Sequence, residues 1–179
     1  MSLSWSHALL MVEKYDEMLD FYTDVLGFEV TDAGELGENK VCFMSQGAND
    51  HHQVAIVSGK PPGSPPPAIN HFAFRTESLA EVKGWYQRLS ADDRVDGLGP
   101  VTHGNAWSVY FKDPDGNGIE VFCDTPWHVS QPVVDSWNPQ ADDDSIMSAT
   151  KEKFSSDPEF QPIEDYYAAR KAHLASRGI

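Results

Sequence analysis

Two histidines and one glutamate are the residues of this chain best suited to hold a metal ion. His7 begins the apolar stretch "HALLMV", His71 begins "HFAF", and Glu120 is the only charged residue of "IEVFC". A carboxylate in such an apolar strand is costly to bury unless it is paired or bound to a metal. Two imidazoles and one carboxylate form the facial triad that holds non-heme Fe(II), although the same ligands also accept Mn(II) or Zn(II). The residues therefore predict a divalent metal site without choosing the metal.

An internal repeat supports this interpretation, because a single histidine in a strand is more often a structural residue than a ligand. A shift of 64 positions places His7 on His71 and Phe21 on Trp85, so that both histidines open the first strand of a similar half. The proline-rich stretch "KPPGSPPP" separates the halves and reads as an extended connector. Equivalent strands of two paired halves face a shared interior, where the two histidines and the glutamate would meet.

Each half reads as a strand, an amphipathic helix and several short antiparallel strands, with the turn "DPDGNG" joining the last two. We therefore predict an α+β fold in which two βαβββ modules, 4–59 and 68–125, pair into a curved mixed sheet around the metal site. The linker is 60–67. Residues 126–179 form an extended and helical C-terminal tail, for which packing, oligomer contact and a role as a lid all remain open.

Two helices are expected in this tail, at 142–154 and at 162–178, the first capped by Asp or Ser. Two further tail histidines, His128 and His173, are expected to face solvent.

Composition limits the classes of partner. The formal charge is −15 and the pI is about 4.6, which disfavours nucleic acid and anionic membranes as partners because phosphate binding needs clustered Lys and Arg. No apolar run approaches the length that spans a bilayer, and no secretory leader is recognisable. Cys42 and Cys123 lie in apolar strand-like segments and are expected to be reduced core thiols. These features predict a cytoplasmic protein.

The two strand–helix–strands halves, the "DPDGNGIE" turn and the His…His…Glu order resemble the vicinal oxygen chelate superfamily over residues 4–125. That superfamily includes glyoxalase I, extradiol dioxygenases, methylmalonyl-CoA epimerase, fosfomycin resistance proteins and bleomycin-binding proteins. Its shared motifs determine the fold better than the activity. A shift of 68 places Phe43 on Phe111 and His52 on Glu120, so a histidine stands where glyoxalases and epimerases use a carboxylate or glutamine as a metal ligand.

Further residues resemble the single-domain extradiol dioxygenases related to biphenyl-2,3-diol 1,2-dioxygenase. His51 and His52 resemble a histidine pair of which one member is an acid–base group beside the metal, and strand alternation favours His52 for this role. The segment "HGNAWSVYFKDPDGNGIE" resembles one in which a histidine and an asparagine precede a tyrosine; here these are His103, Asn105 and Tyr110. The interval from Asn105 to Tyr110 is shorter than in two-domain enzymes.

The resemblance implies an Fe(II)-dependent extradiol ring-cleavage dioxygenase, with Mn(II) as another metal and O2 as co-substrate. The substrate would be a small catecholic diol, to which Tyr110 donates a hydrogen bond, and a homodimer or higher oligomer is expected. Two other functions stay open. One is a glyoxalase- or epimerase-like lyase or isomerase with the same metal ligands, and the other is a metal-free protein that binds a small molecule such as a drug.

Overall fold

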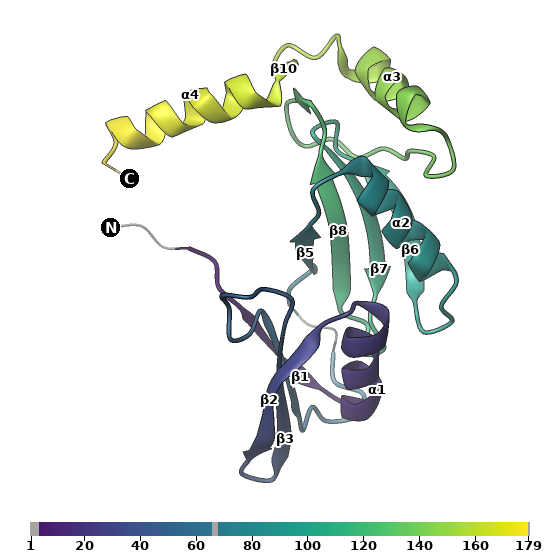
Figure 1. The fold of residues 1–179 in the computed structure, drawn as a ribbon, viewed down its shortest axis with the longest axis vertical. Coiled ribbons are helices and arrows are strands. Elements are labelled where there is room, and N and C mark those ends of the chain that lie inside the picture. Colours follow the sequence, from purple (N-terminus) through teal and green to yellow (C-terminus); the bar gives the residue numbers. More distant parts are fainter. Residues whose placement is uncertain (1–3, 66–67, 179) are drawn as a thin grey trace.

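The computed structural model describes residues 4–65 and 68–178 and contains the two predicted modules (Figure 1). Each module is a four-stranded sheet of order first–fourth–third–second, in which the first strand pairs in parallel with the fourth and the others are antiparallel. The first module comprises β1 (Ala8–Val12), α1 (Tyr15–Asp20), a π-helical turn η1 (Phe21–Val25), β2 (Glu29–Leu36), β3 (Asn39–Ser45) and β4 (Val54–Ser58). The second comprises β5 (His71–Arg75), α2 (Leu79–Ser90), β6 (Asp96–Thr102), β7 (Ala106–Lys112) and β8 (Gly118–Asp124).

The first helix forms as its apolar spacing predicts. Met18, Phe21, Tyr22 and Val25 are all buried, and the chain leaves the helix through Gly27, whose φ of 76° is a left-handed conformation that glycine adopts without strain. In the second module, the Ser78 hydroxyl caps α2, as it accepts a hydrogen bond from the main-chain nitrogen of Glu81 at 3.3 Å, and the buried face of α2 includes Val82 and Leu89.

One hydrophobic core joins the modules. The rings of Phe28 and Phe74 lie 5.4 Å apart, and those of Phe21 and Phe111 lie 6.4 Å apart, so residues of the first module pack directly on strands of the second. The prediction of two βαβββ modules is thereby confirmed. The strands form two separate four-stranded sheets, however, because the described strands β1 and β5 are each hydrogen-bonded only within their own module.

The turn between β7 and β8 fastens the modules together. The main-chain nitrogens of Glu13 and Lys14 donate to the Asp115 carboxylate at 2.9 and 3.0 Å, and Lys60 Nζ lies 3.1 Å from it. The Asp115 side chain is only 1% exposed. Burial raises the pKa of Asp115, but these hydrogen bonds together bring it below its ordinary value. A carboxylate of the second module thus satisfies the main-chain donors that precede α1 in the first.

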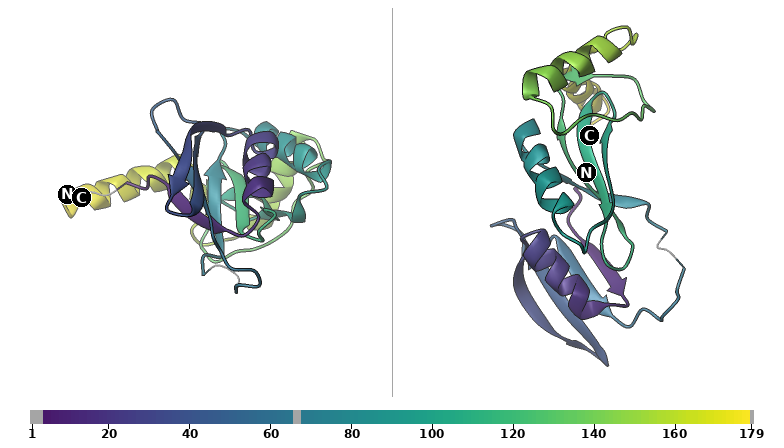
Figure 2. Two further views of the ribbon diagram at one scale, coloured as in Figure 1. Left: turned by 90° about the horizontal axis from the view of Figure 1, so that it is seen from below. Right: turned by 90° about the vertical axis from the view of Figure 1, so that its right-hand side faces the viewer.

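The C-terminal tail packs on the second module (Figure 2). Trp137 is buried and its indole nitrogen donates to the main-chain oxygen of Ser108 at 2.9 Å, while Trp107 donates to Thr150 at 3.0 Å. The elements of the tail are β9 (Trp127–His128), α3 (Asp143–Phe154), β10 (Gln161–Pro162) and α4 (Ile163–Ser176). The expected cap of α3 is present, as Asp142 accepts from the main-chain nitrogen of Ser145.

Helix α4 projects away from the modules and has no buried residue. The expectation that His128 faces solvent is wrong. It is 6% exposed, its ring stacks on Tyr166 at 3.7 Å, and its Nε2 lies 3.1 Å from a carboxylate oxygen of Glu159. Sequence periodicity did not reveal this contact because it joins two segments of the tail that are far apart in the chain.

Cys42 and Cys123 are buried free thiols, as predicted. In the described part of the chain, no helix has the length and apolarity needed to cross a membrane.

We expect Asp115→Asn to lower the free energy of unfolding by about 2 kcal/mol, because the substitution removes a buried charge whose donors remain. Since the folded pKa of Asp115 is lowered, its stabilisation is present above the unfolded pKa of about 3.9 and disappears as the pH falls through the lower folded value. Urea unfolding from pH 7 to pH 3 measures both effects.

Asp93→Asn, at an exposed position, is the matched control and should change the free energy of unfolding by less than about 0.5 kcal/mol. Equal stabilities of the two variants at pH 7 would contradict the proposed fastening.

Candidate metal and catalytic site

Glu120 is the centre of the candidate site in the second module. It lies in the middle of β8 and is 7% exposed. The Ser108 hydroxyl donates to its Oε1 at 2.5 Å, and His71 Nε2 lies 3.4 Å from its Oε2. Among the described residues, no Lys or Arg lies within 4.0 Å of this carboxylate. A buried carboxylate without a cationic partner has the chemistry of a metal ligand.

His71 is placed beside Glu120 by strand pairing. β5 runs parallel to β8 with Ala73 opposite Glu120, and His71 is two residues before Ala73 on the same face. The Asn70 side-chain oxygen lies 2.8 Å from His71 Nδ1 and accepts a hydrogen bond from it. In the neutral ring this leaves the Nε2 lone pair directed at the carboxylate.

The separation of these two atoms fits a shared cation. Nitrogen and oxygen ligands lie about 2.1 Å from a bound transition metal such as zinc, so two adjacent ligands of one ion are about 3.0 to 3.4 Å apart. The measured 3.4 Å between His71 Nε2 and Glu120 Oε2 is within this range. His71 and Glu120 therefore fit two positions of a divalent metal ion.

Tyr110 and His103 adjoin this pair. Tyr110 lies directly opposite Glu120 in the β7–β8 ladder, its ring is 5.1 Å from that of His71, and its hydroxyl is 3.0 Å from His103 Nε2. Burial, followed by the negative charge of Glu120, raises the pKa of Tyr110 well above its ordinary value, so that it remains a neutral phenol. The site thus has a protonated hydroxyl next to the two candidate ligands.

The first module holds a second group of histidines. The rings of His7 and His52 are 4.3 Å apart, His51 Nδ1 lies 3.0 Å from His52 Nδ1, and Phe43 packs against His52 at 5.0 Å. Burial and then the neighbouring charges of His7 and His51 lower the pKa of His52, which favours its neutral form. His51 also lies 4.0 Å from a carboxylate oxygen of Asp32.

Both His51 and His52 lie in the loop before β4, whose first residue is Val54. The strand-alternation argument used to choose between them therefore does not apply, because alternation holds only within an extended strand. The contact with His7 and the lowered pKa distinguish His52.

The two groups remain separate in a single chain. Within residues 4–65 and 68–178, no three His, Cys, Asp or Glu side chains lie close enough together to hold one metal ion. The structure brings His71 to Glu120 and His7 to His52, and the complete triad of His7, His71 and Glu120 stays a prediction. Asn105 lies in the turn before β7, where its main-chain oxygen accepts from the nitrogen of Thr125 at 3.0 Å.

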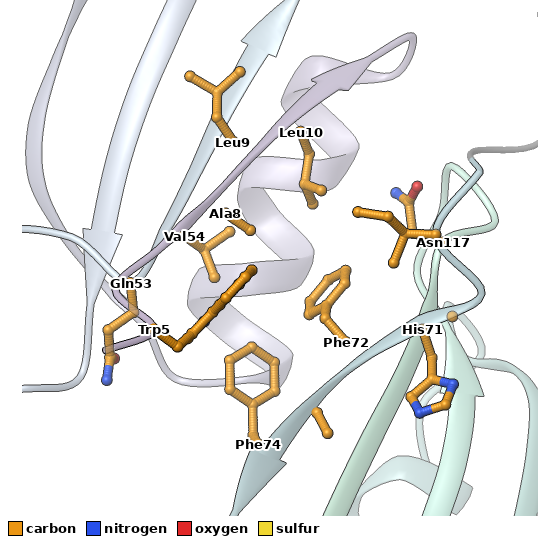
Figure 3. Close-up of a pocket in the computed structure, with 13 residues that line it drawn as sticks. Trp5, Ala8, Leu9, Leu10, Gln53, Val54, His71, Phe72, Phe74 and Asn117 are labelled. Atoms are coloured by element: carbon orange, nitrogen blue, oxygen red, sulfur yellow. The ribbon is translucent and has the colours of Figure 1, made fainter. Parts of the chain in front are cut away.

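A cavity of about 450 Å³ lies between β1 and β5 (Figure 3). Phe72 and Phe74 point into it from one side, and Trp5 and Leu10 line it from the other, whereas the ring of His71 is directed away from Phe72. The cavity therefore lies between the first-module sheet and β5, and His71 is among the residues that line it.

Two residues that support the site were missed by the sequence analysis. Ser108 is a small polar residue in the stretch "WSVYF", on the same face as Tyr110, and Asn70 directly precedes His71. Both signals are visible in the sequence, but their significance depends on which side chains they face.

The chain belongs to the Glyoxalase/Bleomycin resistance protein/Dioxygenase superfamily, whose sequence profile matches residues 4–121. It is 34% identical over 126 residues to biphenyl-2,3-diol 1,2-dioxygenase 3 of Rhodococcus globerulus, across 66% of this chain and 62% of that protein. It is 27% identical to a probable lactoylglutathione lyase of Vibrio parahaemolyticus, across 64% of this chain and 86% of that protein. The chain thus spans less than two thirds of the length of the dioxygenase. Both of these relatives are named as enzymes.

Among solved structures, the chain is similar to a glyoxylase/bleomycin resistance protein/dioxygenase domain from Frankia sp. EAN1pec. The TM-score is 0.59 at 18% identity, over 70% of this chain and all of that one. A fosfomycin resistance protein FosX from Listeria monocytogenes, complexed with Mn(II) and sulfate, matches with a TM-score of 0.51 at 21% identity, over 70% of this chain and 95% of that one. Both matches support the fold.

We expect Glu120→Gln to weaken the binding of Fe(II) or Mn(II) by more than about 100-fold. Mutation of a residue that only hydrogen-bonds to a metal ligand typically lowers metal affinity by about 10- to 100-fold, and loss of a ligand should have a larger effect. Anaerobic metal titration of the full chain measures this. Glu152→Gln, at an exposed position of α3, is the control and should bind as the wild type does. Unchanged affinity in Glu120→Gln would place the metal elsewhere.

Proposed function

We propose that the protein is an Fe(II)-dependent extradiol dioxygenase that cleaves the ring of a catecholic diol. The observation that supports this best is the contact of His71 with the buried carboxylate of Glu120, beside the hydrogen-bonded Tyr110 and His103. The sequence similarity to biphenyl-2,3-diol 1,2-dioxygenases adds to it. Fe(II), which His71 and Glu120 would hold together with the predicted ligand His7, would supply Lewis acidity toward the diol hydroxyls and redox chemistry with O2.

The protein's own groups would then orient the substrate and move its protons. His71 and Glu120 hold one side of the site, and Tyr110 lies beside both, within reach of a diol oxygen bound there. His52 is the proposed acid–base residue, a role that contributes about 10²- to 10⁴-fold to rate when such a group is well placed. Its lowered pKa favours the neutral imidazole, which is the form that can accept a proton.

The first-module ligand must still reach the site. His7 contacts His52 and His71 contacts Glu120, but among the described residues no three His, Cys, Asp or Glu side chains form a group that could hold one metal ion. The full site therefore requires either closure of the modules onto each other or a second chain that presents its first module. A homodimer remains our proposal on this ground.

A proton-transfer lyase or isomerase is the second candidate, supported by the similarity to the lactoylglutathione lyase. Such an enzyme would need a fourth ligand from the first module. His52 is the candidate because it contacts His7, although the strand pairing makes Ala55, and not His52, the counterpart of Glu120. The two candidates thus assign His52 different tasks, namely proton transfer in the dioxygenase and metal ligation in the lyase.

We expect the anaerobically reconstituted Fe(II) protein to convert catechol or 2,3-dihydroxybiphenyl in air to a yellow ring-opened product, with one O2 consumed per turnover. Visible absorption and an oxygen electrode measure this. The zinc-loaded protein is the control and should be inactive, because zinc has no redox chemistry. Full iron occupancy without turnover across a broad set of catechols would refute the proposal.

We expect His52→Ala to keep wild-type iron content while losing at least about 100-fold in kcat, because it removes a proton carrier and leaves the predicted ligands. His173→Ala, on the exposed helix α4, is the matched control and should keep full activity. If His52→Ala instead loses its metal, the four-ligand lyase is favoured.

A further inference from the structure

The first part of the C-terminal tail encloses the turn that holds His103. The main chains of Thr102 and Asp135 exchange hydrogen bonds of 2.7 and 3.0 Å, and the Gln131 side chain donates to the His103 main-chain oxygen at 2.7 Å. Gly104 has a φ of 77°, and a Cβ at this position would come within 2.8 Å of Val129. Residues 129–135 therefore lie tightly against this turn, although they are beyond residue 121, where the family match ends.

One contact from this segment determines the tautomer of His103. The main-chain oxygen of Val133 lies 2.6 Å from His103 Nδ1. A carbonyl oxygen can only accept a hydrogen bond, so Nδ1 carries the proton. In the neutral imidazole Nε2 is then an acceptor, and the Tyr110 hydroxyl, 3.0 Å away, must donate to it.

The direction of that second hydrogen bond affects the site. A phenol has one proton, and the Tyr110 hydroxyl lies 3.0 Å from the Nε2 acceptor of His103, which directs the proton there. Burial raises the pKa of the phenol, and the Glu120 carboxylate, a second neighbour of this hydroxyl, raises it further by its charge and by hydrogen bonding. With its proton on the side of His103, the Tyr110 oxygen keeps lone pairs for another donor, and the ring of His71 lies 5.1 Å from the tyrosine ring. A group that binds there meets a hydrogen-bond acceptor.

We propose that residues 129–135 are a positioning element of the active site, in which the Val133 carbonyl fixes His103 so that Tyr110 accepts a hydrogen bond from the substrate. This reverses the direction expected from the sequence, in which Tyr110 donates to the substrate. Val133 and His103 act through Tyr110 and are positioning groups. The identity of the substrate group as a diol hydroxyl rests on the proposed function, whereas the tautomer of His103 does not.

The tautomer is tested directly by ¹⁵N NMR of the full chain labelled at histidine, at pH 8 and without metal, with His103→Gln used to assign the resonances. We expect a protonated Nδ1 and an unprotonated Nε2 for His103. The Gln131 side chain donates to the main-chain oxygen of His103 and accepts from the main-chain nitrogen of Val133. Gln131→Ala removes both hydrogen bonds and should shift the His103 resonances toward the averaged values of a free imidazole.

Gln140→Ala is the matched control, since Gln140 lies exposed in the same tail, and it should leave the His103 resonances unchanged. A protonated Nε2 in the wild type, or equal responses to the two glutamine substitutions, would overturn the proposal. Because this measurement needs no turnover, it decides the point even if the protein cleaves no catechol.

A double-mutant cycle tests the coupling to substrate. With iron content verified, Tyr110→Phe and His103→Gln should each lower kcat/KM for the diol about tenfold, which is the scale of one hydrogen bond. If His103 acts through Tyr110, the double variant should be no worse than Tyr110→Phe alone. Multiplied losses, about 100-fold in the double variant, would show that His103 acts independently of Tyr110 and would overturn the proposal.

Discussion

The buried carboxylate of Glu120 is the constraint on which the site depends. It is enclosed by β7 and β5. A serine hydroxyl and an imidazole lie close to its two oxygens, and the Tyr110 hydroxyl is a further neighbour. Such a charge is unfavourable in an apolar sheet unless a cation balances it. The local arrangement meets this need, because His71 presents a nitrogen at ligand distance and Asn70 fixes the ring in the tautomer that leaves this nitrogen free.

The rest of the fold keeps this arrangement rigid. The second-module sheet sets the register that aligns Glu120 with Tyr110, and the shared aromatic core holds the first module against it. Asp115 adds a polar connection at the opposite end of β8 from the tail. The buried tryptophan Trp137 and the segment before it then cover the strand that contains Tyr110, so a part of the chain outside the superfamily match contributes to the geometry of the site.

Much of this could be predicted from residue spacing. The repeat that places His71 on His7, the helical face of Met18 and Phe21 and the hairpin turn at Asp115 each follow from local periodicity or turn chemistry, which the tertiary structure did not alter. The candidate site was predictable only in part. Residue type suggested Glu120 and His71 as ligands, but the roles of Ser108 and Asn70 depend on distances between side chains that no spacing rule supplies.

The sequence by itself determined the two modules, their elements and the residues with metal-ligand chemistry, because hydrophobic period and residue type act locally. Only the tertiary structure decided three things: that the strands form two sheets with a cavity between them, that His128 is buried against Tyr166, and that Val133 contacts His103. Each of these joins segments distant in the chain, where packing determines the outcome. The direction of the Tyr110 hydrogen bond belongs with them, since a single carbonyl oxygen of the tail sets it through the tautomer of His103.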